Sequence, residues 1–81
     1  MNCSAVLVVA RPGRLDAAAE AVAQVEGVFV HQRDEDHDRL ICTIEAETER
    51  EEVARFNAVS RLEPVLDASL LSHYVGLDAD E

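Results

Sequence analysis

The sequence predicts an α+β domain in which a four-stranded antiparallel sheet carries two helices on one face. Residues Cys3–Ala10 are small or β-branched and almost free of polar groups, which indicates a strand covered on both faces. Apolar residues recur at helical spacing over Leu15–Val25 and again over Val53–Val59. Segments typical of strands lie between and after these two helices, so the expected order of elements is βαββαβ.

The first predicted helix lies between two turn signals. Pro12 suits the first turn of a helix, where the missing N–H has no partner to lose, and Gly27 is a natural C-terminal cap. Val28–Arg33 then alternates between two faces in the manner of a second strand, and the polar segment 34–38 indicates a hairpin loop. The apolar positions of the helix share one face: Leu15, Ala18, Ala19, Val22 and Val25.

The second half of the chain predicts a strand, a helix and a last strand. Arg39–Glu45 alternates and forms the third strand, and Val65–Tyr74 alternates and forms the fourth. The helix between them starts at Thr48, which forms a capping box with Glu51. Its first turn carries acids that complement the helix dipole: Glu49, Glu51 and Glu52. Its apolar stripe is Val53, Phe56 and Val59, and Glu51 is spaced to pair with Arg55.

Right-handed crossovers around the two helices place the strands in the spatial order 4-1-3-2. The first strand then lies in the interior of the sheet, as its composition suggests. This arrangement is the ferredoxin-like architecture. We expect one such domain over residues 1–76, followed by an acidic, disordered tail over residues 77–81.

The composition excludes several classes of function. The formal charge of −10, from 17 acidic and 7 basic residues, repels nucleic acid and anionic membrane surfaces. No stretch is long enough to cross a bilayer, and the N-terminus lacks the basic and apolar regions of a signal peptide. Cys3 and Cys42 are far apart and in no metal-type spacing. These features predict reduced thiols and a cytoplasmic protein.

The alternation along the strands predicts which residues lie beneath the helices. The covered face is expected to hold Val6, Val8, Val28, Val30, Leu40, Cys42, Ile44, Leu66, Ala68 and Leu70. The open face is expected to hold Ala5, Leu7, Val9, Phe29, His31, Ile41, Thr43, Glu45, Asp67, Ser69, Leu71 and His73. That open face is too apolar for bare solvent, and exposed apolar area of this kind indicates an interface.

No set of residues predicts catalysis, a metal site or a bound cofactor. The chain has no Cys-x-x-Cys motif, no glycine-rich phosphate loop and no recognisable nucleophile–base pair. The histidines and the acids of segment 34–38 lack the ligand spacing of a metal site: His31, His37 and His73. An acylphosphatase-like enzyme needs an anion-binding loop after the first strand. Arg11 and Arg14 are present there, but Pro12 removes a donor and glycines are few.

Four segments resemble, in order and spacing, the strand segments of the NapD family, which are assembly chaperones of periplasmic nitrate reductase. They are Asn2–Pro12, Gly27–His31, Arg39–Ala46 and Val65–His73, and together they span nearly the whole chain. The resemblance implies a ferredoxin-like fold, a cytoplasmic location, no catalysis and binding of the twin-arginine signal peptide of the catalytic subunit NapA. It also implies that the peptide docks as a helix on the open face, and that binding restrains export until the molybdenum cofactor is installed.

The chain departs from the pattern of that family at three positions. Ser72 stands where an aromatic residue is common, and Pro64 stands where glycine is usual before the last strand. Val9 occupies an outward position that is frequently polar. These departures leave the expected fold intact and affect the detailed contacts with a peptide.

We therefore expect a chaperone that binds the twin-arginine signal peptide of a NapA-type precursor. The apolar part of the peptide is assigned to Leu7, Val9, Ile41 and Leu71, and its arginines to Glu45 and Asp67. The full expected set is Ala5, Leu7, Val9, Ile41, Thr43, Glu45, Asp67, Ser69, Leu71 and His73. The alternative is a small-ligand regulatory domain that dimerises through its sheet. Because such a dimer leaves no room for a peptide, the chaperone is expected as a monomer.

Overall fold

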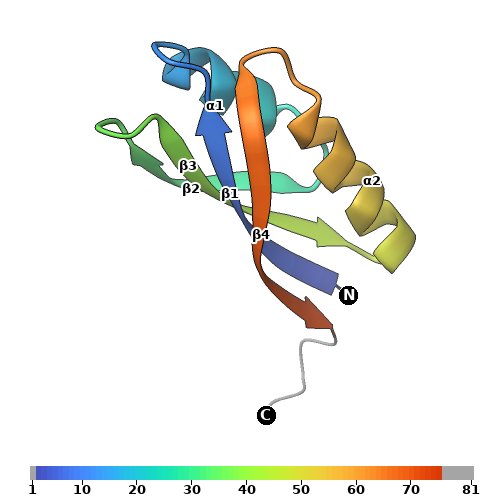
Figure 1. Ribbon diagram of the computed structural model, residues 1–81. Coiled ribbons are helices and arrows are strands. Elements are labelled where there is room, and N and C mark those ends of the chain that lie inside the picture. The colour runs from blue at the N-terminus through green and yellow to red at the C-terminus, as the bar shows by residue number, and fades with distance from the viewer. Residues whose placement is uncertain (1, 76–81) are drawn as a thin grey trace.

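The computed structural model describes residues 2–75, with side chains for residues 2–71. Its elements are β1 (Asn2–Ala10), α1 (Leu15–Ala23), β2 (Val28–Asp34), β3 (Arg39–Ala46), α2 (Glu49–Ser60) and β4 (Val65–Val75). The strands form one antiparallel sheet in the order β2-β3-β1-β4, with the two helices against one side of it (Figure 1). The predicted ferredoxin-like α+β fold is confirmed. The expected boundary at residue 76 and the tail over 77–81 lie outside the described residues.

The core lies between the helices and the covered face of the sheet. Burial alternates strictly along β1 and β3, so that one face of each strand is inside and the other is partly open. This confirms the faces predicted for both central strands. The side chains that form the core are Val6, Val8, Ala10, Leu15, Ala18, Ala19, Val22, Val28, Leu40, Cys42, Ile44, Val59 and Val65.

Two bulges in the edge strand β4 break the predicted alternation. The first lies between the pairs Val9–Asp67 and Ala10–Val65, so Val65 is buried while Leu66 is 55% exposed. Leu66 was expected under the helices, and that prediction is wrong. The second bulge lies at Leu71, after which Ser72 is opposite Ala5. His73 was expected in line with Ser69 and Leu71, but it lies opposite Ser4, a residue of the covered face. The backbone pairing of His73 therefore departs from the strict alternation predicted for this strand.

A bulge in the other edge strand, β2, has a similar effect. The register shifts after Val30, so that Gln32 lies opposite Ile41 and Arg33 opposite Leu40. Arg33 then points to the helix side and forms an ion pair with Asp16 of α1. Bulges are common at sheet edges because they twist the edge away from further pairing. Here the bulge brings Gln32 to the open face, a residue that strict alternation does not place there.

Helix α1 is shorter than the periodicity predicts. It begins at Leu15 and ends at Ala23, so Pro12 lies in the turn before the helix and not in its first turn. Val25 lies beyond the helix but still packs against the core. Gly27 is not the C-terminal cap, because the cap position is Gln24. Gly27 instead has φ +78° in the turn before β2, where its carbonyl accepts a bond from the Glu45 amide at 2.8 Å.

Replacing Gly27 with alanine is expected to destabilise the domain by about 2–3 kcal/mol. A Cβ at this position would lie 2.6 Å from the Glu45 carbonyl oxygen and 2.5 Å from Arg55 Nη1, in addition to the strained φ. Gly13→Ala is the matched control, since φ there is +75° but no atom lies within 4 Å of the new Cβ. Its expected cost is about 1 kcal/mol. Urea denaturation measures both, and equal losses would contradict the assigned contact.

Helix α2 begins as predicted and packs differently. Thr48 is its N-cap, with the hydroxyl accepting from the Glu51 amide at 3.1 Å. Val53, expected in the apolar stripe, is exposed, whereas Glu52 is only 5% exposed and accepts a hydrogen bond from the Ser4 hydroxyl. Arg55, expected to pair with Glu51, donates to the Glu45 carbonyl oxygen and lies 4.0 Å from Glu26. The helix is therefore held by polar contacts to the sheet as well as by Phe56 and Val59.

Candidate functional site

The uncovered face of the sheet, called the open face below, contains a groove floored by apolar side chains. Leu7 lies directly opposite Ile41 in the β1–β3 ladder. The same two residues and Leu71 line a cavity of about 530 Å³, which we call the apolar groove. Its other lining residues are Gln32, Arg33, Asp34 and Arg39. Leu71 is 54% exposed, so the groove presents apolar area to solvent. Burial of that area against a partner would stabilise the complex.

The rim of the apolar groove is formed by the β2–β3 hairpin. Asp34 accepts a bond from Arg39 at 2.9 Å, and its other close neighbour is the His37 ring nitrogen at 2.9 Å. The bond from Arg39 holds the pKa of Asp34 below its ordinary value, with a smaller contribution from His37. The carboxylate of Asp34 is therefore already engaged by Arg39 and by the His37 ring of the same hairpin.

A second cavity, of about 450 Å³, lies at the other end of β3 and is called the acidic cavity. Four carboxylates line it, together with Phe29 and the side chain of Arg55. The ring of Phe29 is 48% exposed, and Phe29 lies opposite Thr43 on the open face. The carboxylates belong to Glu26, Glu45, Glu47 and Glu51. The cavity therefore lies at the end of the sheet, where Phe29 and Glu45 of the open face meet α2 and the turn before β2, and its carboxylates can hold a cation.

The residues between the two cavities are small or polar. Ala5 lies opposite Thr43, whose hydroxyl is 2.7 Å from His31 Nε2. On β4, Ser69 lies opposite Leu7 and donates a bond of 3.2 Å to Asp67. These side chains lie on the open face between the apolar groove and the acidic cavity.

The structure does not bring Glu45 and Asp67 together, although both were assigned to the arginines of a peptide. Glu45 lies opposite Cys3 at one end of β1, and Asp67 lies opposite Val9 at the other. Six residues of strand separate them, or about 20 Å. Adjacent arginines have Cα atoms only about 3.8 Å apart and do not bridge that separation. A single arginine pair can therefore contact Glu45 or Asp67, but not both.

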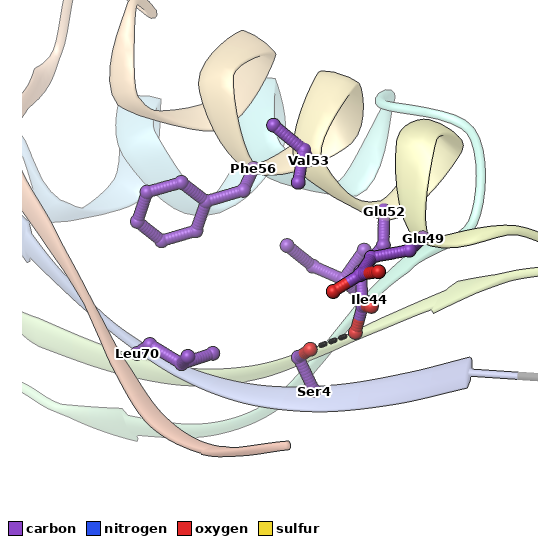
Figure 2. Close-up of a pocket in the computed structure, with 7 residues that line it drawn as sticks. All are labelled: Ser4, Ile44, Glu49, Glu52, Val53, Phe56 and Leu70. Atoms are coloured by element: carbon purple, nitrogen blue, oxygen red, sulfur yellow. Dashed lines mark hydrogen bonds between the residues drawn. The ribbon is translucent and has the colours of Figure 1, made fainter. Parts of the chain in front are cut away.

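A third cavity, of about 370 Å³, lies on the covered side of the sheet beneath α2. Figure 2 shows Phe56 and Val53 reaching down from the helix, with Leu70 and Ser4 below them. The bond from Ser4 to Glu52 closes one end of this space (Figure 2). Leu70 is 56% exposed because α2 covers the edge strand incompletely. The sheet separates this cavity from the open face.

The thiols of the chain are poor nucleophiles. Burial raises the pKa of Cys42 to about 11, and burial together with the nearby Glu45 and Glu52 carboxylates raises the pKa of Cys3. Both thiols are therefore protonated at neutral pH. Among the described residues 2–75, no group of His, Cys, Asp and Glu side chains is placed to share a metal ion. Neither helix in that range has the length and apolar character needed to cross a membrane.

Comparison with known proteins assigns the chain to a family. The profile of the NapD protein family matches residues 1–76. The chain belongs to the NapD family. Its structure is similar to the solution structure of the E. coli Tat proofreading chaperone protein NapD, with a TM-score of 0.81 and 25% identity. That likeness covers 100% of this chain and 84% of the other. A sequence comparison with curated proteins gives no match.

Several residues of the apolar groove and the acidic cavity in this NapD family member were not predicted. Gln32 reaches the face through the β2 bulge, for which the sequence carries no signal. Glu51 was assigned to the start of α2, and Glu47 and the turn residue Glu26 were given no role. The fold joins these residues to Phe29 and Glu45 in one cavity. The alternation of β3 predicts Glu45 on the open face. This was the feature of the sequence that pointed to the acidic cavity.

Proposed function

We propose that this protein is a cytoplasmic chaperone that binds the twin-arginine signal peptide of a NapA-type molybdoenzyme precursor on its open face. Binding would restrain export through the twin-arginine translocation (Tat) pathway until the molybdenum cofactor is inserted. The chaperone itself performs no catalysis. Membership of the NapD family and the likeness to a Tat proofreading chaperone support this role.

The observation that carries the proposal is the open face itself. A twin-arginine signal peptide has a basic segment followed by an apolar segment. The open face offers an apolar groove at Leu7, Ile41 and Leu71, and carboxylates around Phe29. Burial of apolar area supplies affinity, and the carboxylates supply steering and specificity for cations. The net charge of −10 adds a general attraction for a basic peptide.

Calorimetric titration with a synthetic NapA-type signal peptide tests the proposal. We expect saturable binding of one peptide per chain. A peptide whose arginine pair is replaced by lysines should bind about tenfold more weakly, since lysine keeps the charge but loses bidentate contact with carboxylates. Absence of saturable binding, or equal affinity for an unrelated basic peptide of the same length, would contradict the proposal.

A further inference from the structure

We infer that the signal peptide lies on the open face in one direction only, running parallel to β1. Its arginine pair then sits at the acidic cavity and its apolar segment in the apolar groove. This inference rests on the proposed function and adds a direction to it. It follows from the charges, the aromatic ring and the spacing of the two cavities.

The two ends of the open face differ in charge. Four carboxylates and a single guanidinium line the acidic cavity. At the apolar groove, the guanidinium of Arg39 is paired with the Asp34 carboxylate, whereas that of Arg33 lies on the helix side and pairs with Asp16. Arg55 is held by the Glu45 carbonyl oxygen, and Asp34 is held by Arg39. An arginine pair is therefore attracted to the acidic cavity more strongly than to the apolar groove, where the one carboxylate is already paired.

The acidic cavity also offers an aromatic surface for a guanidinium. The half-exposed ring of Phe29 lines it beside Glu45 and Glu47. Planar guanidinium groups stack on aromatic rings while their N–H groups donate to carboxylates. The residues that line the apolar groove include no aromatic side chain. The ring thus favours the same end of the face as the charges do.

The spacing of the two cavities fits a peptide that occupies both. Ile41 and Glu45 are four residues apart on β3, or about 13 Å. A helix covers that length with about nine residues. β1 runs from Cys3, opposite Glu45, to Val9, opposite Arg39, so the peptide has the direction of β1. In this direction the positive end of a helical peptide's dipole meets the carboxylates of the acidic cavity.

Paramagnetic relaxation enhancement with the full chain tests the direction. The probe is the synthetic signal peptide with a nitroxide on a cysteine at its N-terminus or, separately, at its C-terminus. The N-terminal label should broaden the amides of Phe29 and Glu45–Glu47. The C-terminal label should broaden those of the hairpin, 33–39. The reverse pattern, or the same pattern with both labels, would overturn the inference. A peptide that fails to bind at all in the calorimetric titration would instead overturn the proposed function.

Charge removal at each end gives a second, independent readout. E45Q/E47Q takes two charges from the acidic cavity and should weaken peptide binding at least about tenfold at low salt. The matched control E35Q/D36N takes two charges from the exposed hairpin loop and should change affinity less than about twofold. Circular dichroism checks that both variants fold. Equal effects of the two variants, or a larger effect of E35Q/D36N, would also overturn the inference.

Discussion

Replacing both Leu7 and Leu71 with glutamate is expected to abolish binding of the signal peptide while the domain stays folded. The two side chains line the apolar groove, and burying a leucine contributes about 1.5–3 kcal/mol. Loss of both contacts therefore amounts to at least about 3 kcal/mol, or more than a hundredfold in affinity. The added negative charge should attract a basic peptide. A loss of affinity in this variant therefore isolates the apolar contact.

The matched control for this variant is Val53→Glu. Val53 is 54% exposed, comparable to Leu71, but it lies on α2 beside the cavity on the covered side of the sheet. V53E should keep the affinity of the unchanged protein in the same calorimetric titration. The single variant L71E separates binding from folding, since Leu71 is on an edge strand. Retained affinity in L7E/L71E, or a loss of affinity confined to V53E, would show that the peptide does not bind on the open face.

Replacing Leu40 with alanine is expected to cost about 3 kcal/mol of unfolding free energy. Leu40 is 0% exposed and is among the largest fully buried side chains of the core. Its truncation removes apolar burial and leaves a cavity between β3 and the helices. For a small domain that loss is a large fraction of the total stability.

Leu66→Ala makes the same chemical change at an exposed bulge of β4 and is the control for L40A. Because Leu66 is more than half exposed, we expect a loss below about 1 kcal/mol. Chemical denaturation monitored by circular dichroism measures both variants. A loss in L66A as large as in L40A would show that Leu66 is buried, as the strand alternation had suggested.

The central strands were predictable from the sequence because they follow a simple rule. β1 and β3 pair along their lengths without a bulge, so a period of two assigns each residue to a face. The edge strands β2 and β4 contain bulges, and each bulge reverses the alternation beyond it. Leu66 was misplaced for this reason, and Gln32 reaches the open face through such a bulge. A single sequence gives no sign of where an edge strand bulges.

The candidate site was predictable where it depends on β1 and β3, and not where distant segments meet. Leu7, Ile41 and Glu45 were placed on the open face by alternation alone. The acidic cavity joins the turn before β2, the end of β3 and the start of α2, and alternation within one strand does not reveal such a junction. Glu52 is a further example, because its partner Ser4 is 48 residues away in sequence.

Methyl-selective nuclear magnetic resonance during a titration with the signal peptide tests the location of the binding site most directly. The account predicts that the methyl signals of Leu7, Ile41 and Leu71 shift as peptide is added, while those of the exposed Val53 on α2 do not. Shifts concentrated at Val53 and Leu70, with Leu7 and Ile41 unchanged, would contradict it. That pattern would show that the peptide binds in the cavity beneath α2 and not on the open face.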